Sequence, residues 1–263
     1  MFKVLKTAKF PVNQFRGQGS PNERYHYAQK LTADFYDLAK DEFGTYDVKL
    51  SKIKKLYLKL LSTHKRIEVS GLENNINATG RVMIGANSKG NVEGYFVQIK
   101  PNAITKALSM QEFGTLMHET DHLFSYFTNP KYTQRVIEMT IKGYRNKKYH
   151  QFFDKELQSA KKQNRKDFVP VLIKKLEKYF KNKTNDEKIN TLQDFRYRLI
   201  NERNAYNTGN FYQNAIEKYH PNVLSQRTEP INTKKFYFDE KIEIISKMLK
   251  NTIQEERTKL SKR

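Results

Sequence analysis

Apolar residues recur every three or four positions over most of this chain, which is the spacing of one helical face. The clearest stripe has spacings of 4, 3, 4 and 3 and consists of Phe113, Met117, Thr120, Phe124 and Phe127. Ser109 precedes this stripe, and Glu112 follows Ser109 by three residues, which is a capping box. Asn129-Pro130 follows the stripe and cannot continue it. The pattern therefore predicts a helix that begins at Ser109 and ends at Asn129-Pro130.

Further helices are predicted on both sides of this one. Ser20-Pro21-Asn22-Glu23 combines an N-cap, a proline at the first helical position and an acidic residue at the third, and Gly44 would end the helix that starts there. Gly209 is expected to close a later helical region. Apolar stripes predict the remaining helices near residues 53–61, 132–145, 149–163, 168–181, 186–207 and 239–258.

The period changes to that of strands between residues 67 and 100. Residues 81–86 and 94–99 are mostly apolar and contain β-branched and aromatic residues, and the Asn, Ser and Gly residues at 87–91 favour a turn between them. The fold class predicted is α+β and mostly α-helical, with a small β-hairpin or sheet before the helix of residues 109–129. An exposed edge strand there would bind an extended peptide by strand addition, or the hairpin merely covers the core.

The predicted domain organisation is simple. Residues 1–19 are expected to form an extended N-terminal arm, because Phe10-Pro11 and Gly17-Gln18-Gly19 resist helix formation. Residues 20–263 are expected to form a single domain.

His118-Glu119-Thr120-Asp121-His122 spells H-E-x-x-H on the helix of residues 109–129. Positions i and i+4 lie on one helical face, about 5–6 Å apart, so His118 and His122 are able to bind one Zn²⁺. Glu119 between them would take a proton from a zinc-bound water. The motif therefore predicts a zinc hydrolase, most often a peptidase, or else a helix with two surface histidines.

A third protein ligand is needed because catalytic zinc sites usually have three. The apolar stripe of residues 186–207 places Glu202 at a core-facing position, and a buried carboxylate requires a partner. Glu202 is the favoured ligand, with a salt bridge to Arg198 or Arg203 as the alternative interpretation. Glu138, sixteen residues after His122, is the rival ligand candidate.

Residues 117–123 resemble the zincin metallopeptidases, and Asn201-Glu202-Arg203-Asn204-Ala205-Tyr206 looks like the N-E-x-x-A segment of their gluzincin branch. The resemblance covers about 30 of the 263 residues. It implies that His118, His122 and Glu202 bind zinc, that Glu119 is the general base, and that a small sheet lies beside the motif helix.

The chain departs from that pattern in two respects. The interval from His122 to Glu202 is long, and Tyr206 stands where some members carry an Asp that orients a ligand imidazole. The residue that would polarise the substrate carbonyl or stabilise an oxyanion is not evident. Tyr206, Tyr212 and His220 are the candidates.

Charge suggests a second interpretation. The net charge is 49 − 28 = +21, and the basic helical segment at about 142–183 carries 14 Lys or Arg against 4 Asp or Glu, a net +10. Such a segment favours nucleic acid or an acidic partner, or its lysines are only solvated. The alternative function is therefore a basic nucleic-acid-associated or virion structural protein with a non-catalytic or absent metal site.

The absence of cysteine excludes disulfides, a thiol nucleophile and thiolate-bound zinc. Neither a signal peptide nor an apolar run of membrane-spanning length is seen, so we expect a cytoplasmic or virion-associated protein. The expected substrate, which follows from the H-E-x-x-H motif, is a protein or peptide.

Overall fold

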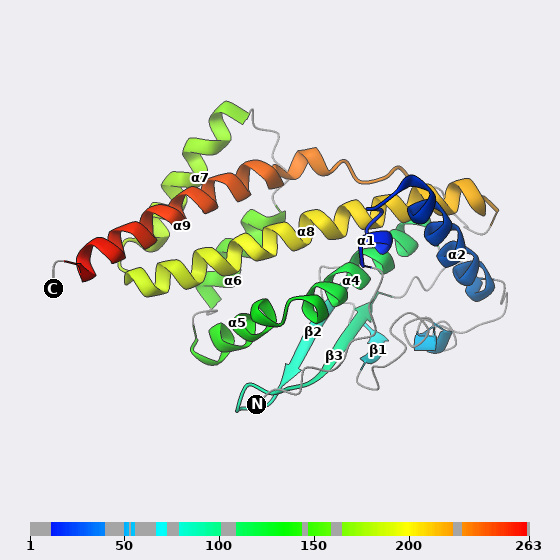
Figure 1. The fold of residues 1–263 in the computed structure, drawn as a ribbon, viewed down its shortest axis with the longest axis horizontal. Coiled ribbons are helices and arrows are strands. Elements are labelled where there is room, and N and C mark those ends of the chain that lie inside the picture. The colour runs from blue at the N-terminus through cyan, green and yellow to red at the C-terminus, as the bar shows by residue number, and fades with distance from the viewer. Residues whose placement is uncertain are drawn as a thin grey trace. The chain divides into compact units, whose positions relative to one another are not determined.

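The computed structural model describes residues 12–39, 50–52, 54–55, 67–72, 79–100, 109–143, 147–158, 165–222 and 228–261. Within these ranges the chain is mostly helical with one small sheet, which confirms the α+β class (Figure 1). The helices are α1 (Val12–Phe15), α2 (Pro21–Ala39), α4 (Met110–Thr128), α5 (Pro130–Ile141), α6 (Lys147–Gln158), α7 (Arg165–Phe180), α8 (Asn185–Tyr219), the 3-10 helix η1 (Thr233–Phe236) and α9 (Phe238–Leu260).

The chain divides into two compact units. The first comprises residues 1–125 and 204–231, and the second comprises residues 126–203 and 232–263. Both α4 and α8 contribute residues to each unit and run without a break across the boundaries. The single domain predicted for residues 20–263 stays a prediction.

The first unit contains the sheet, whose strand order is β1-β3-β2. The hairpin of β2 (Gly80–Ala86) and β3 (Val92–Ile99) is confirmed, with Val82 opposite Val97. Its turn is closed by the Asn87 side chain, which accepts hydrogen bonds from the backbone N–H groups of Lys89 and Asn91 at 3.0 Å each. A third strand, β1 (Ile67–Gly71), pairs in parallel with β3 and was not predicted.

The two capping boxes form as predicted. The Glu112 carboxylate accepts a hydrogen bond from the Ser109 backbone N–H at 2.7 Å, and the Ser109 hydroxyl accepts one from the Glu112 N–H at 3.2 Å. The Glu23 carboxylate accepts from the hydroxyl and N–H of Ser20, and these bonds lower the pKa of Glu23. The entire apolar stripe of α4 is buried, and Phe113 and Met117 are fully inaccessible.

Two predicted boundaries were wrong. Val12–Phe15 form one helical turn within the segment predicted to be extended, because a preceding proline is compatible with a first turn and Gly17, at φ 66°, ends it. Gly209 does not close α8, which continues to Tyr219. A Cβ at position 209 would lie 2.8 Å from the Gly114 carbonyl oxygen, so this glycine serves close helix packing rather than termination.

Some predictions fall outside the described residues. These are the extended conformation of residues 1–11, the helix stop at Gly44 and most of the helix predicted at 53–61, of which residues 54–55 are described and helical. In the described part of the chain, none of the helices combines the length and apolar character that a membrane crossing requires.

Candidate metal centre

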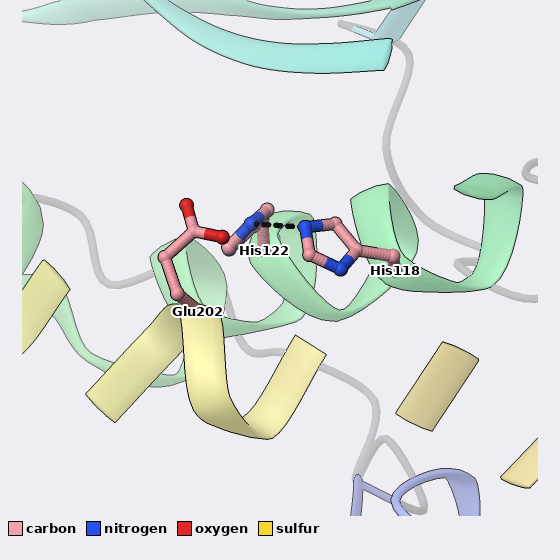
Figure 2. A group of neighbouring side chains, drawn as sticks. All are labelled: His118, His122 and Glu202. Carbon is pink, nitrogen blue, oxygen red and sulfur yellow. Dashed lines mark hydrogen bonds between the residues drawn. The ribbon is translucent and has the colours of Figure 1, made fainter. Parts of the chain in front are cut away.

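The two motif histidines meet on one face of α4. Their Nε2 atoms lie 3.0 Å apart, and their rings are nearly perpendicular with centroids separated by 4.7 Å. Both side chains are half-buried. Figure 2 shows the two rings side by side along the helix, each turning a nitrogen toward the other. The expected i, i+4 arrangement is therefore present.

Glu202 completes this group from α8. One ligand atom from each of His118, His122 and Glu202 lies within 4.8 Å of the other two, and Figure 2 shows the carboxylate directed at the His122 ring. Among the described residues this is the group whose side chains are able to hold a metal ion. Glu138 is not part of it. That side chain is exposed on α5 and accepts a hydrogen bond from Gln134 at 3.0 Å.

The donor set fits zinc. Two imidazole nitrogens and one carboxylate oxygen are ligands that zinc uses in catalytic sites. Tetrahedral ligands at about 2.0–2.1 Å from a zinc ion lie about 3.3 Å from one another. The 3.0 Å between the two Nε2 atoms is close to that value. All three residues are partly accessible, which leaves an ion a route to them.

Two glycines allow α8 to approach α4 within the first unit. A Cβ at Gly114 would overlap the side chain of Gln213, and a Cβ at Gly209 would lie 2.8 Å from the Gly114 carbonyl oxygen and 3.6 Å from the His118 Cβ. Real Cβ atoms essentially never come within 3.0 Å of backbone, so any larger residue at 209 would push the helices apart. Glycine at these two positions brings the backbone of α8 beside His118.

Glu119, the predicted base, is buried at 5 % exposure. It lies against the first residue of β2, since a Cβ at Gly80 would be 2.8 Å from the Glu119 Cγ and 2.9 Å from its Oε1. Thr115, one turn earlier on α4, borders the same space. The sheet therefore covers Glu119 with backbone alone and leaves room for its carboxylate.

Asp121, the second carboxylate of the motif, contacts different neighbours. Its fully buried carboxylate accepts hydrogen bonds from Arg16 Nε at 2.7 Å, from Arg16 Nη2 at 3.1 Å and from the Thr208 hydroxyl at 3.0 Å. Arg16 also donates to Ser125 at 2.6 Å. Phe15, beside Arg16, is fully buried against Phe124. The segment after α1 is therefore fastened to the motif helix.

Sequence reasoning missed this network. A signal was present, because Asp121 lies four residues after Met117 and three before Phe124, on the buried stripe of α4. A carboxylate at such a position requires a cationic or hydrogen-bonding partner. Nothing in the sequence identified Arg16, 105 residues away, as that partner.

The three candidates for carbonyl polarisation lie in different surroundings. The half-buried Tyr206 ring packs against His118, with centroids 4.5 Å apart. Tyr212 is fully buried among Phe15 and Phe113, and burial, followed by the nearby Tyr27 and Asp121, raises its pKa. His220 stacks on Tyr36. Of the three, Tyr206 is the one whose ring packs against a motif histidine.

No family model, curated protein or solved structure matches this chain. What the site can do therefore follows from its residues. The imidazoles of His118 and His122 and the carboxylate of Glu202 lie close together. A second carboxylate, that of the buried Glu119, follows His118 on α4. Such a set combines a place for a divalent cation with a neighbouring proton acceptor.

Proposed function

We propose that this protein is a zinc-dependent peptidase. The convergence of His118, His122 and Glu202, three residues from two helices whose ligand atoms lie within 4.8 Å of one another, carries the proposal. If the two histidines were incidental surface residues, the half-buried Glu202 carboxylate, 80 residues further along the chain (202 − 122 = 80), would not be expected beside them. The resemblance of the motif and of residues 201–206 to zincin peptidases supports a peptide as the substrate.

The site residues have two proposed roles, metal binding and proton transfer. His118, His122 and Glu202 would hold the ion, which supplies Lewis acidity toward a water molecule and a substrate carbonyl. The Glu119 carboxylate accepts a proton from the attacking water and passes it to the leaving amine. Its burial beneath Gly80 keeps that carboxylate out of bulk solvent. A positioned base of this kind contributes about 10²–10⁴-fold to the rate.

The sheet supports the choice of an extended peptide as the substrate. Among the described strands β2 is at an edge, since the order is β1-β3-β2. Its first residue, Gly80, is in contact with Glu119. A peptide added to this edge by backbone hydrogen bonds would run close to the proposed base.

Metal analysis and turnover test the proposal together. We expect untagged protein washed with a weak chelator to contain one zinc per chain, and His118→Ala to lose it. Glu119→Gln should keep the zinc and cleave a fluorescence-quenched peptide library at least about 100-fold more slowly. Glu138→Gln, which removes the same charge from an exposed position, is the matched control and should behave as wild type. Wild-type protein that takes up no added zinc, or Glu119→Gln with unchanged turnover, would overturn the proposal.

A further inference from the structure

A lysine-lined hollow lies in the second unit, formed by α6, α7 and the turn that follows α7 (all green to yellow-green in Figure 1). Its volume is about 770 Å³. The residues that line it are Lys148, Gln151, Phe152, Lys155, Glu156, Lys175, Lys178, Tyr179, Lys181, Asn182 and Lys183. We refer to it as the lysine cavity.

The charge of this cavity is strongly positive. Six lysines and one glutamate line it, which gives 6 − 1 = +5. Lys175 pairs with the buried Glu156, and Lys183 pairs with Glu187 at 3.0 Å. In the part of the chain that the structure describes, no carboxylate lies within ion-pair distance of the other four, which are Lys148, Lys155, Lys178 and Lys181.

Those four lysines are all exposed, so their side chains contribute little to the packing of the fold. Lysines that serve only as a solvated face are distributed around a helix, whereas these come from two helices and a turn and surround one hollow. A concave surface with low-dielectric walls focuses the field of such charges. The arrangement favours an anionic ligand with several charges.

An aromatic pair forms part of the same wall. The rings of Phe152 and Tyr179 are stacked, with centroids 5.2 Å apart and planes inclined by 25°, and both side chains are half-exposed. Phe153, fully buried beneath them, meets both rings edge-on. The pair is therefore held rigidly while part of its surface stays accessible. Accessible aromatic rings beside lysines are the two components of single-stranded nucleic-acid sites, because bases stack on the rings while phosphates meet the cations.

We propose that the lysine cavity binds single-stranded nucleic acid, with phosphates at its lysines and a base against Phe152 and Tyr179. An acidic peptide would satisfy the lysines equally well, but it has no use for an accessible aromatic pair. The site lies wholly in the second unit and uses none of the residues proposed to bind zinc. It therefore stands whether or not the protein is a peptidase.

The ligand class is tested with three probes on the wild-type protein. Fluorescence anisotropy would measure binding of a labelled oligothymidylate of about 12 nucleotides, of an abasic oligomer of the same length, and of labelled polyglutamate. We expect the oligothymidylate to bind at least about 5-fold more tightly than the abasic oligomer, since one stacked base contributes about 1–3 kcal/mol. Equal affinity for all three probes would show a non-selective polyanion surface and overturn the proposal.

The location is tested with two triple variants of equal charge. The cavity variant replaces exposed lysines of the hollow by neutral glutamine, and the control does the same on the exposed face of α9 in the same unit. Both reduce the net charge from +21 to +18. The substitutions are Lys155→Gln, Lys178→Gln and Lys181→Gln for the cavity, and Lys247→Gln, Lys250→Gln and Lys259→Gln for α9.

The two variants should differ in salt dependence as well as affinity. If each of three cavity lysines meets a phosphate, the slope of log K against log salt becomes less steep by about 2, and oligothymidylate affinity at 0.1 M salt falls by about 100-fold. The α9 variant should keep the wild-type slope. Equal losses in both variants, or no loss in the cavity variant, would place binding elsewhere and overturn the proposal. Circular dichroism would verify that both variants are folded.

Discussion

The ion pair between Arg16 and Asp121 makes a sharp prediction about stability. Asp121 is fully buried, and the Arg16 side chain is 17 % exposed. Three hydrogen bonds end on this one carboxylate, two from Arg16 and one from Thr208. Asp121→Asn preserves the volume but places an N–H₂ group where the carboxylate accepts, so one donor of Arg16 or Thr208 loses its acceptor.

The expected magnitude follows from the burial. Removing one partner of a buried, hydrogen-bonded ion pair costs about 3–5 kcal/mol, because the other charge stays buried without compensation. We therefore expect Asp121→Asn and Arg16→Gln each to lower the free energy of unfolding by about 3 kcal/mol. The double variant should be more stable than the sum of the two losses implies, with a coupling of about 1–3 kcal/mol.

Urea denaturation followed by circular dichroism measures these values. Arg203 and Asp239 provide the matched control, since they form an Arg–Asp pair in which the Asp239 side chain is 79 % exposed. Asp239→Asn should cost no more than about 0.5 kcal/mol, as exposed pairs do. If Asp121→Asn costs as little as Asp239→Asn, or if the double variant shows no coupling, Arg16 does not fasten the N-terminal segment to α4.

Three further predictions concern the proposed metal ligands, the helix crossing and a half-buried tyrosine. Glu202→Gln should weaken zinc binding by at least about 10-fold in isothermal titration, whereas Glu138→Gln should leave it unchanged; the reverse result would make Glu138 the ligand. Gly209→Ala should destabilise the protein by about 1–2 kcal/mol in urea, because its Cβ would lie 2.8 Å from the Gly114 carbonyl oxygen. Helix propensity alone predicts that Gly209→Ala raises the free energy of unfolding by up to about 1 kcal/mol. A measured increase in stability would therefore contradict the close packing of Gly209 against Gly114. Burial, and then the charge of Asp34, raises the pKa of Tyr27 to about 12 in the folded protein. Since the unfolded chain gives up this proton first, stability should fall as pH rises from about 10 to 12, and Tyr27→Phe should flatten that decline in urea titrations; an unchanged decline would refute this cause.

Local signals predicted the helices and strands well. The two capping boxes specify their helix ends through bonds between residues three positions apart, and the stripe of α4 is buried as its spacing requires. Glu202 was found in the same way, as a carboxylate on the continuation of an apolar stripe, and it is half-buried beside the histidines. A residue that conflicts with the apolar pattern of its own helix is visible without any knowledge of its partner.

Features that depend on distant segments were not predictable. Gly209 has the local signature of a helix stop, yet its role is set by Gly114, 95 residues earlier (209 − 114 = 95). β1 has five residues and finds its partner β3 in a parallel register that no turn specifies. Arg16 is one of 49 basic residues, and only the folded chain shows that it meets Asp121. In each case the deciding contact joins positions that no local pattern connects.

The motif helix serves several neighbours because successive residues of a helix point in directions about 100° apart. Glu119 faces Gly80 of β2, Asp121 faces Arg16 and Thr208, and His118 faces Tyr206, all within the first unit. Thr120 is fully buried, and its hydroxyl donates a hydrogen bond to the Leu116 carbonyl oxygen at 2.7 Å. The histidines are the two of these five residues that keep an accessible edge. Since the other three side chains of the motif are buried against neighbours, an ion or substrate would approach α4 along the edge that the two histidines share.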